Sequence, residues 1–336
     1  MKIATMITSP RHAQAEARRM EELGYDVIMT NESSHDPFIL STLVAERTER
    51  VEILTYIAVA FARNPMIAAH SAHDVQQLSG GRFTLGLGSQ VKAHVERRFS
   101  MPWSHAAPRM RDFVGALHAI WDCWYEGRPL EYRGSFYRHD LTSPIFIPER
   151  GDHPRPHIGL AAVGPEMHRV AAQSADSLLC HSFTTPKYLR EVTLPAIARA
   201  TAERRRPESA LRLVGMPFIA TGETEEELGR AVAGVRKTIA FYASTPAYRA
   251  VLEVHGLEAA QPELLRLFKL GRWKEMGELV DDGFVDTFAV VGDAARCARS
   301  LHERFAGIFD LIGGYAGSGP GMPEAVMQEL RKLQTA

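Results

Sequence analysis

The 336-residue chain contains little cysteine and has no excess of charge of either sign. Its three cysteines, Cys123, Cys180 and Cys297, are odd in number, far apart and outside any CxxC motif. This pattern argues against a disulfide framework and a cysteine zinc site, and it indicates a reducing compartment. The net charge of −1 offers no basic face to a nucleic acid. We therefore expect neither disulfides nor a nucleic-acid partner.

Long apolar runs are also missing, and we expect no leader segment. The longest apolar stretches fall far short of the roughly 20 residues that span a membrane, and Met1-Lys2-Ile3 leads directly into a predicted strand. The chain also lacks GxSxG, a Ser-His-Asp order and a GxGxxG after its first strand. We expect a soluble cytoplasmic protein with no membrane partner that is not a hydrolase. The missing GxGxxG weakens the case for a dinucleotide-binding sheet.

Residues 51–92 establish the pattern that the rest of the chain follows. Val51–Ala60 is an almost continuous apolar and β-branched run, which is typical of a strand buried on both faces. Asn64 is a good helix cap, and Pro65 suits the first helical position. Arg82–Leu87 then forms a second buried strand. Such a strand–helix–strand unit predicts a right-handed parallel crossover.

The same alternation continues to the end of the chain. Eight apolar segments are predicted as strands, at residues 2–8, 25–30, 51–60, 82–87, 157–162, 176–180, 211–219 and 308–313. Residues of about 126–156 and 244–284 break the rhythm and are interpreted as insertions, the first with a hairpin at 130–137. The sequence predicts one (β/α)8 TIM barrel over residues 1–336, with an open doubly wound sheet as the alternative.

The active site of such a barrel lies at the C-terminal ends of its strands, and two histidines stand there. His35 follows the second strand and His181 follows the sixth. His35 is a candidate for acid–base chemistry or for contact with a substrate. Glu32 is close enough in sequence to raise the pKa of His35 as an opposite charge. The alternative is that Glu32 forms an ordinary salt bridge in the barrel mouth.

Small residues at two other strand ends leave room for a cofactor. The turn Ala162-Val163-Gly164 places free backbone N–H groups at the start of a helix, which suits a phosphate. Gly86 and Gly88 allow the fourth strand to approach a flat ring. His70 and His73 share one face of a helix, but that helix belongs to the outer ring, so we expect no metal site.

Three segments resemble the bacterial luciferase-like family of flavin and deazaflavin oxidoreductases. They read NESSHDPF, ARNPMIAAHSAHDVQQLSGGRFTLGLGSQ and HIGLAAVGPEMHRVA, and the match extends over nearly the whole chain in the family's order. The central segment is most similar to the branch that uses the 8-hydroxy-5-deazaflavin coenzyme F420. The resemblance implies a (β/α)8 barrel with the cofactor ring at the barrel mouth.

The resemblance also implies roles for particular residues. It implies a non-prolyl cis peptide bond at Tyr56-Ile57, a phosphate tail at the turn 162–164 and a catalytic histidine at His35. The loop Ser89-Gln90-Val91 has no carboxylate, unlike the family's sugar-phosphate dehydrogenases, so we do not expect a sugar phosphate substrate. The residues expected to be catalytic are His35 and Glu32, and those expected to contact the cofactor are Tyr56, Ile57, Ala58, Gly88, Ser89, Gln90, Ala162, Val163, Gly164 and His181.

Three functions remain open at this point. With F420, the enzyme would transfer a hydride between the deazaflavin and a small alcohol, aldehyde, imine or enone. With FMN, it would be the oxygenase half of a two-component monooxygenase that needs a flavin reductase as partner. A non-catalytic cofactor-binding protein is the third, and the two insertions argue against it. The family resemblance implies a homodimer, and Phe38, Phe61 and Phe183 suggest an apolar or aromatic substrate.

Overall fold

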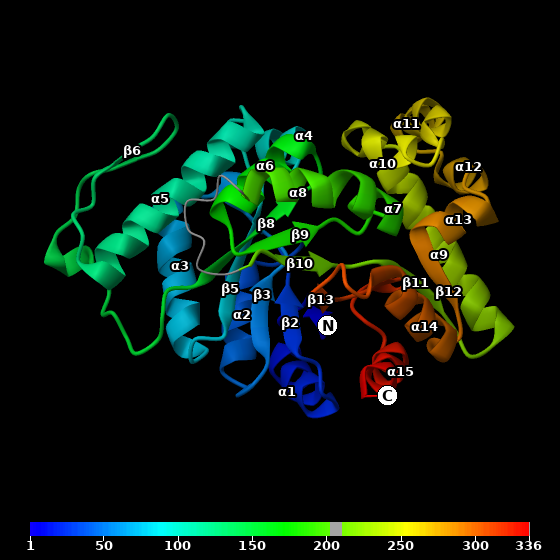
Figure 1. Cartoon of the computed structure of the whole chain (residues 1–336), viewed down its shortest axis with the longest axis horizontal. Coiled ribbons are helices and arrows are strands. Elements are labelled where there is room, and N and C mark those ends of the chain that lie inside the picture. Colours follow the sequence, from blue (N-terminus) through cyan, green and yellow to red (C-terminus); the bar gives the residue numbers. More distant parts are fainter. Residues whose placement is uncertain (202–209, 336) are drawn as a thin grey trace.

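The computed structural model describes residues 1–201 and 210–335, and in these ranges eight parallel strands close into a barrel (Figure 1). The order around the barrel follows the chain, and the last strand pairs with the first to close the circle. This confirms the predicted (β/α)8 barrel and excludes the open sheet. The strands are β1 (Lys2–Ile7), β2 (Val27–Thr30), β3 (Glu52–Thr55), β5 (Phe83–Gly88), β8 (His157–Ala162), β9 (Ser177–Cys180), β10 (Arg212–Gly215) and β13 (Leu311–Ile312).

Helices surround the barrel, and their ends follow the capping residues of the sequence. Asn64 accepts a hydrogen bond from the N–H of Ile67 at 2.9 Å, and Pro65 is the first helical residue of α3, as predicted. Asp36 caps α2 in the same way. The helices that pack between strands are α1 (Ala13–Leu23), α2 (Pro37–Ala45), α3 (Pro65–Leu78), α5 (Ala106–Glu126), α6 (Pro165–Ser174), α8 (Leu194–Thr201), α14 (Ala294–Phe305) and α15 (Glu324–Thr335).

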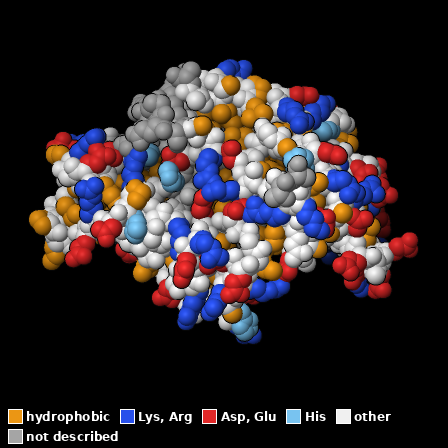
Figure 2. All heavy atoms as spheres, turned by 60° about the horizontal axis from the view of Figure 1, so that its bottom comes forward, with side chains coloured by type: hydrophobic (Ala, Val, Ile, Leu, Met, Phe, Trp, Pro, Cys, Tyr) orange, Lys and Arg blue, Asp and Glu red, His pale blue; other side chains and the backbone are white. Residues whose placement is uncertain are grey.

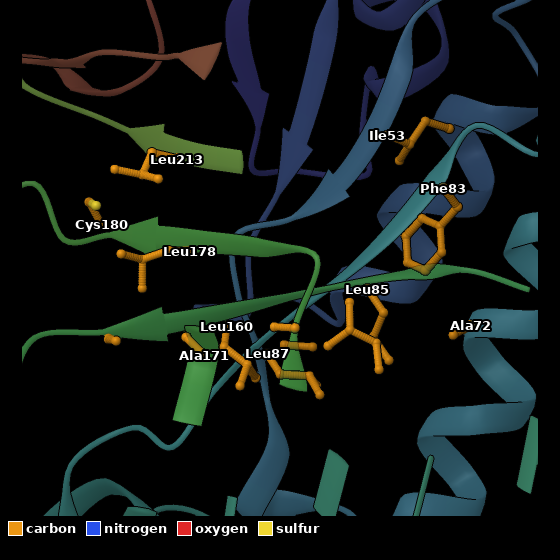
Figure 3. Packing of buried hydrophobic residues seen from close by; sticks show 14 of the residues in the cluster. Ile53, Ala72, Phe83, Leu85, Leu87, Leu160, Ala171, Leu178, Cys180 and Leu213 are labelled. Atoms are coloured by element: carbon orange, nitrogen blue, oxygen red, sulfur yellow. The ribbon is translucent and has the colours of Figure 1, made fainter. Parts of the chain in front are cut away.

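Apolar side chains fill two separate layers. Outside the strands, Phe83 and Leu85 of β5 and Leu160 of β8 pack beneath the helices, toward Ala72 of α3 and Ala171 of α6 (Figure 3). Inside the barrel, a smaller cluster fills the lumen and consists of Ala4, Met6, Val27, Met29, Leu54, Leu179, Val214, Met216 and Leu311. The strands are therefore buried on both faces, which explains their nearly continuous apolar sequences.

Two predicted strands are each split in the structure. The run at 51–60 divides into β3 and β4 (Ala58–Val59), with the peptide bond Tyr56-Ile57 in the cis form between them. The run at 211–219 divides because Pro217 has no N–H to continue the ladder. Beyond it, β11 (Phe218–Thr221) leaves the barrel and joins a second sheet with β12 (Ala289–Gly292), β14 (Tyr315–Ala316) and β15 (Gly319–Pro320).

The two irregular segments lie at opposite ends of the molecule in Figure 1. The first carries the predicted hairpin, formed by β6 (Tyr132–Arg133) and β7 (Arg138–His139). The second packs against α9 (Glu225–Ala243), where a separate apolar cluster lies beneath it. Its helices are η4 (Pro246–Tyr248), α10 (Arg249–Glu253), η5 (Glu258–Ala260), α11 (Gln261–Lys269), α12 (Trp273–Glu278) and α13 (Asp282–Phe288).

The surface mixes charges of both signs. On the face drawn in Figure 2, Lys and Arg side chains alternate with Asp and Glu, and neither sign forms a broad area. Within residues 1–201 and 210–335, no helix has the length and apolarity needed to cross a bilayer.

Candidate active site

The loops after the C-terminal ends of the strands form the barrel mouth, where Glu32 makes an ion pair. Its carboxylate binds the guanidinium of Arg63, with 3.0 Å between Arg63 Nη2 and Glu32 Oε1. It also accepts a hydrogen bond from the N–H of Val59 at 2.6 Å, and the N–H of Glu32 donates to the Ile57 carbonyl. The two charged side chains are only 9% and 11% exposed. Glu32 therefore fastens the loop after β2 to the backbone on either side of Ala58.

His35 lies in the same loop but in a different environment. Its side chain is exposed, and it makes no hydrogen bond with the described residues. The expected interaction between Glu32 and His35 is not formed, because Arg63 occupies both carboxylate oxygens with a forked, charge-assisted contact. The alternative interpretation, a salt bridge of Glu32 within the mouth, is confirmed. The catalytic role of His35 stays a prediction.

The end of β5 and the cis peptide bond fit against each other. A Cβ atom on Gly88 would lie 2.8 Å from the Cδ1 atom of Ile57, and one on Gly86 would lie 1.8 Å from the carbonyl oxygen of Thr55. Gly86 therefore requires glycine because a side chain would meet the backbone, whereas a side chain at Gly88 would have to displace that of Ile57. The cis bond at Tyr56-Ile57 is where the resemblance implied it.

The residues around this contact remain accessible. Tyr56, Ile57, Ser89 and Gln90 are half-buried, whereas Ala58 is buried against β5. The Tyr56 hydroxyl donates a hydrogen bond to the carbonyl of the last residue of β9. The structure thus brings the expected ring-contacting residues of β3, β4 and β5 together at one edge of the mouth.

The turn Ala162-Val163-Gly164 leads from β8 into α6. Gly164 is the N-cap residue with φ −95°, and no side chain caps the helix, so its first N–H groups have no partner within the helix. A Cβ atom built on Gly164 meets nothing within 4 Å. The hydroxyl of Tyr188 holds the turn from behind through the Val163 carbonyl at 3.0 Å. Open space in front of free N–H groups at a helix start fits a phosphate.

His168 is buried directly behind this turn and was not singled out by its sequence. It is 2% exposed and hydrogen-bonds the backbone of Ala162. Its Nδ1 atom has no partner among the described residues, and burial lowers the pKa of His168 to about 4. A hollow of about 10 Å³, the size of one water molecule, lies beside it, so His168 supports the turn as a neutral ring.

His181 lies beyond the end of β9 between two tyrosine rings. It stacks on Tyr248 at 4.6 Å between ring centroids and 25° between planes, and it meets the edge of Tyr242 at 4.6 Å and 81°. Its Nδ1 atom accepts a hydrogen bond from the N–H of Phe183 at 3.0 Å. Burial lowers the pKa of His181 to about 4. Sequence reasoning missed Tyr242 and Tyr248, because more than 60 positions of sequence separate His181 from each and no motif links them.

The three phenylalanines expected to line a substrate pocket are buried. Phe38, Phe61 and Phe183 expose 8%, 0% and 1% of their surface. Phe61 is covered by the guanidinium of Arg109, 4.5 Å from the ring centroid, and Phe183 stacks on Phe288 at 4.3 Å. Phe38 and Phe61 therefore belong to the core, whereas Phe183 lines the small hollow that His181 also lines. The lining of a substrate pocket stays a prediction.

The two histidines of α3 pack against α5. His73 Nδ1 and the hydroxyl of Tyr125 are 2.7 Å apart, and the His70 ring lies against Trp124 at 4.6 Å. These contacts explain both side chains without a metal. In the part of the chain that the structure describes, no three His, Cys, Asp or Glu residues are grouped as metal ligands would be.

Comparison with known proteins places the chain in a family. Residues 2–310 match the family model for luciferase-like monooxygenases. The chain belongs to this family. An uncharacterized protein of Mycobacterium tuberculosis is 47% identical to this luciferase-like chain, over 87% of it and 86% of the relative. Another M. tuberculosis protein, named a putative coenzyme F420-dependent oxidoreductase, is 27% identical over 84% of each chain.

A solved structure agrees with the barrel. The coenzyme F420-dependent tetrahydromethanopterin reductase of Methanopyrus kandleri has a TM-score of 0.77 to this luciferase-like chain. The two are 19% identical, and the match covers 98% of this chain and 96% of the reductase. At this identity the likeness supports the fold alone. The family resemblance of the sequence is thus confirmed by the family match and by the barrel.

Proposed function

We propose that this luciferase-like chain is an F420-dependent oxidoreductase. The observation that carries the proposal is the open, uncapped turn at Gly164 beside the glycine-lined end of β5, on adjacent strands of the barrel. The turn suits a phosphate and the glycine edge suits a flat ring. The relative named a putative coenzyme F420-dependent oxidoreductase supports the choice of cofactor. When bound, the deazaflavin supplies or accepts a hydride.

The chain's own residues would hold the cofactor and move a proton. The backbone N–H groups around Gly164 would bind the phosphate, and His35 would exchange a proton with a small alcohol, aldehyde, imine or enone. Glu32 would act through Arg63 and the Val59 N–H as a positioning group for the edge of the mouth. The residues proposed to contact the deazaflavin ring are Tyr56, Ile57, Ala58, Gly88, Ser89 and Gln90.

An FMN-dependent monooxygenase is the second candidate, because the matching family is described as luciferase-like monooxygenases. FMN also carries a phosphate and a flat ring, so the same turn and the same strand end would serve it. Such an enzyme would need a flavin reductase as partner. The homodimer implied by the resemblance stays a prediction, which light scattering of the purified protein checks for either candidate.

Two variants of Gly164 test the proposed phosphate site. Gly164→Ala fits, because φ is −95° and the space is open, whereas Gly164→Asp adds a negative charge facing the phosphate. We expect Gly164→Asp to weaken F420 binding by roughly 100-fold, the equivalent of about 3 kcal/mol for a lost charge-assisted contact. Gly164→Ala should change the affinity far less. Quenching of F420 fluorescence measures both, and thermal melting confirms that both variants fold.

The same titration with FMN separates the candidates. Tight binding of F420 alone supports the deazaflavin enzyme, and tight binding of FMN alone would replace it with the monooxygenase. Unchanged affinity of Gly164→Asp for F420 would remove the phosphate from this turn. Binding of F420 without turnover of any alcohol or aldehyde would favour a cofactor-binding protein.

A further inference from the structure

Three rings from distant parts of the chain form a box at the mouth, which we call the aromatic box. It consists of His181 after β9, Tyr242 of α9 and Tyr248 of η4. Each of the three side chains is half-buried, so the box keeps surface that a bound molecule can contact.

The tautomer of His181 is fixed by its own chain. Because Nδ1 accepts a hydrogen bond from the Phe183 N–H at 3.0 Å, the ring proton lies on Nε2 in the neutral form. Burial keeps the ring neutral at ordinary pH, since the pKa of His181 is lowered to about 4. The Nε2–H group lies on the side of the ring away from Nδ1, and no hydrogen bond joins it to a described residue.

The position of His181 relates it to the proposed cofactor residues. The preceding residue, Cys180, accepts the hydrogen bond of the Tyr56 hydroxyl, and Tyr56 belongs to the cis peptide bond. On its other side, β9 pairs with β8, whose last residue Ala162 begins the phosphate turn. His181 therefore follows a strand whose last residue adjoins both Tyr56 and the start of the phosphate turn.

The box itself contains no acidic or basic side chain apart from His181, and its rings also contact the apolar rings of Phe183 and Phe218. Burial raises the pKa values of Tyr56, Tyr242 and Tyr248. The side chains that add to this shift are tyrosines and a cysteine, which are neutral at pH 7. For His181 the cause is burial alone. A charged ligand would lose its hydration here without an opposite charge to replace it, whereas a neutral group with one oxygen would gain a hydrogen bond.

We propose that the aromatic box is the substrate subsite and that His181 Nε2–H donates a hydrogen bond to the oxygen of a neutral carbonyl compound or alcohol. Tyr242 and Tyr248 flank the apolar part of that substrate. This inference rests on the proposed function and refines its substrate class to neutral molecules. A neutral imidazole with a fixed tautomer stabilises negative charge on such an oxygen without giving up its proton.

Two amide variants separate the two ring nitrogens of His181. His181→Gln retains an N–H near the position of Nε2, whereas His181→Asn retains an acceptor near Nδ1 and loses the donor. The probe is 4-(dimethylamino)benzaldehyde, whose absorption moves to longer wavelength when its carbonyl oxygen accepts a hydrogen bond. It is added to protein loaded with oxidised F420, which has no hydride to give, so the shift is read without turnover.

We expect a red shift with the wild type and with His181→Gln, and none with His181→Asn. Aldehyde affinity should fall about 10-fold in His181→Asn, as for one lost hydrogen bond. The affinity for F420 should change less than about 2-fold in both variants, because the proposal assigns His181 to the substrate in place of the cofactor contact expected from the sequence. Tyr248→Leu, which retains the donor, should weaken the aldehyde about 10-fold and leave the shift of the bound fraction unchanged.

Several results would overturn the proposal. A full red shift in His181→Asn would show that another group donates, and no shift or no binding in the wild type would reject the substrate class. A loss of F420 affinity as large as the loss of aldehyde affinity would make His181 a cofactor contact. If F420 binds the wild type and the aldehyde does not, this inference fails alone; if F420 itself does not bind, the proposed function fails. Tyr248→Leu decides the matter should both amide variants unfold.

Discussion

The two edges of the barrel mouth carry one histidine each, and they are built in opposite ways. At the β2 edge, charges meet: Glu32 and Arg63 form a nearly buried ion pair, and His35 stands outside it in solvent. At the β9 edge, rings meet: His181 lies between Tyr242 and Tyr248 with its tautomer fixed by the backbone. The charged edge fixes a backbone, whereas the aromatic edge fixes a side chain.

This difference suggests separate roles for His35 and His181. A group that exchanges protons with solvent needs exposure, and His35 has it. A group that holds one substrate atom needs a single orientation, which packing and a backbone hydrogen bond give to His181. We therefore expect substitutions at the β2 edge to affect proton transfer or stability, and substitutions at the β9 edge to affect substrate affinity.

The largest expected effect is on turnover at the β2 edge. His35→Ala should lower turnover by roughly 10²–10⁴-fold if this side chain exchanges the substrate proton. F420 affinity should be nearly unchanged. Steady-state kinetics measure the turnover, and titration with F420 measures the affinity. His157→Ala is the control, because His157 begins β8 at the end of the strand away from the mouth. Full activity of His35→Ala would remove the role.

Breaking the ion pair should mainly cost stability. Glu32→Ala leaves the buried charge of Arg63 without its main partner, and the free energy of unfolding should fall by about 3–5 kcal/mol. The double variant Glu32→Gln with Arg63→Met removes both charges and should recover part of that loss. Denaturant unfolding measures each variant. Unchanged stability together with lost activity would instead make Glu32 a catalytic acid or base.

The smallest effect concerns the pH dependence of stability and comes from the two buried histidines, His168 and His181. Burial holds the pKa values of His168 and His181 at about 4, below the value of about 6.5 in an unfolded chain. As pH falls from 7 to 5, the unfolded state gains protons that the folded state does not, so each ring should cost about 2 kcal/mol of stability. His168→Gln should lose less than the wild type over this range in denaturant unfolding. An equal loss of stability in His168→Gln and in the wild type would contradict the lowered pKa of His168.

The barrel could be predicted from sequence because local signals repeat along the chain. Apolar runs buried on both faces gave the strands, and the Asn64-Pro65 pair gave the start of α3. The split at Pro217 and the strand β12 were not predicted from the sequence. The pairing of β11 with residues 289–292 depends on the tertiary structure. Short apolar runs do not reveal which sheet they will join.

The candidate site was only partly predictable for the same reason. Glycines and strand-end histidines are visible in sequence, and the resemblance located the cis bond at Tyr56-Ile57. The partner of Glu32 was not visible, because Arg63 is 31 positions away and reaches it only through the fold. The rings around His181 likewise come from α9 and the second irregular segment, which no local pattern connects to β9.

The most direct test is to follow the absorbance of oxidised F420 bound to the wild-type protein while neutral alcohols are added, with a sugar phosphate as the charged comparison. Hydride transfer to or from a substrate held at the aromatic box predicts loss of the F420 absorbance with at least one neutral alcohol and none with the sugar phosphate. Reaction with the sugar phosphate alone, or no change with any alcohol and no reoxidation of reduced F420 by any aldehyde, would contradict the account.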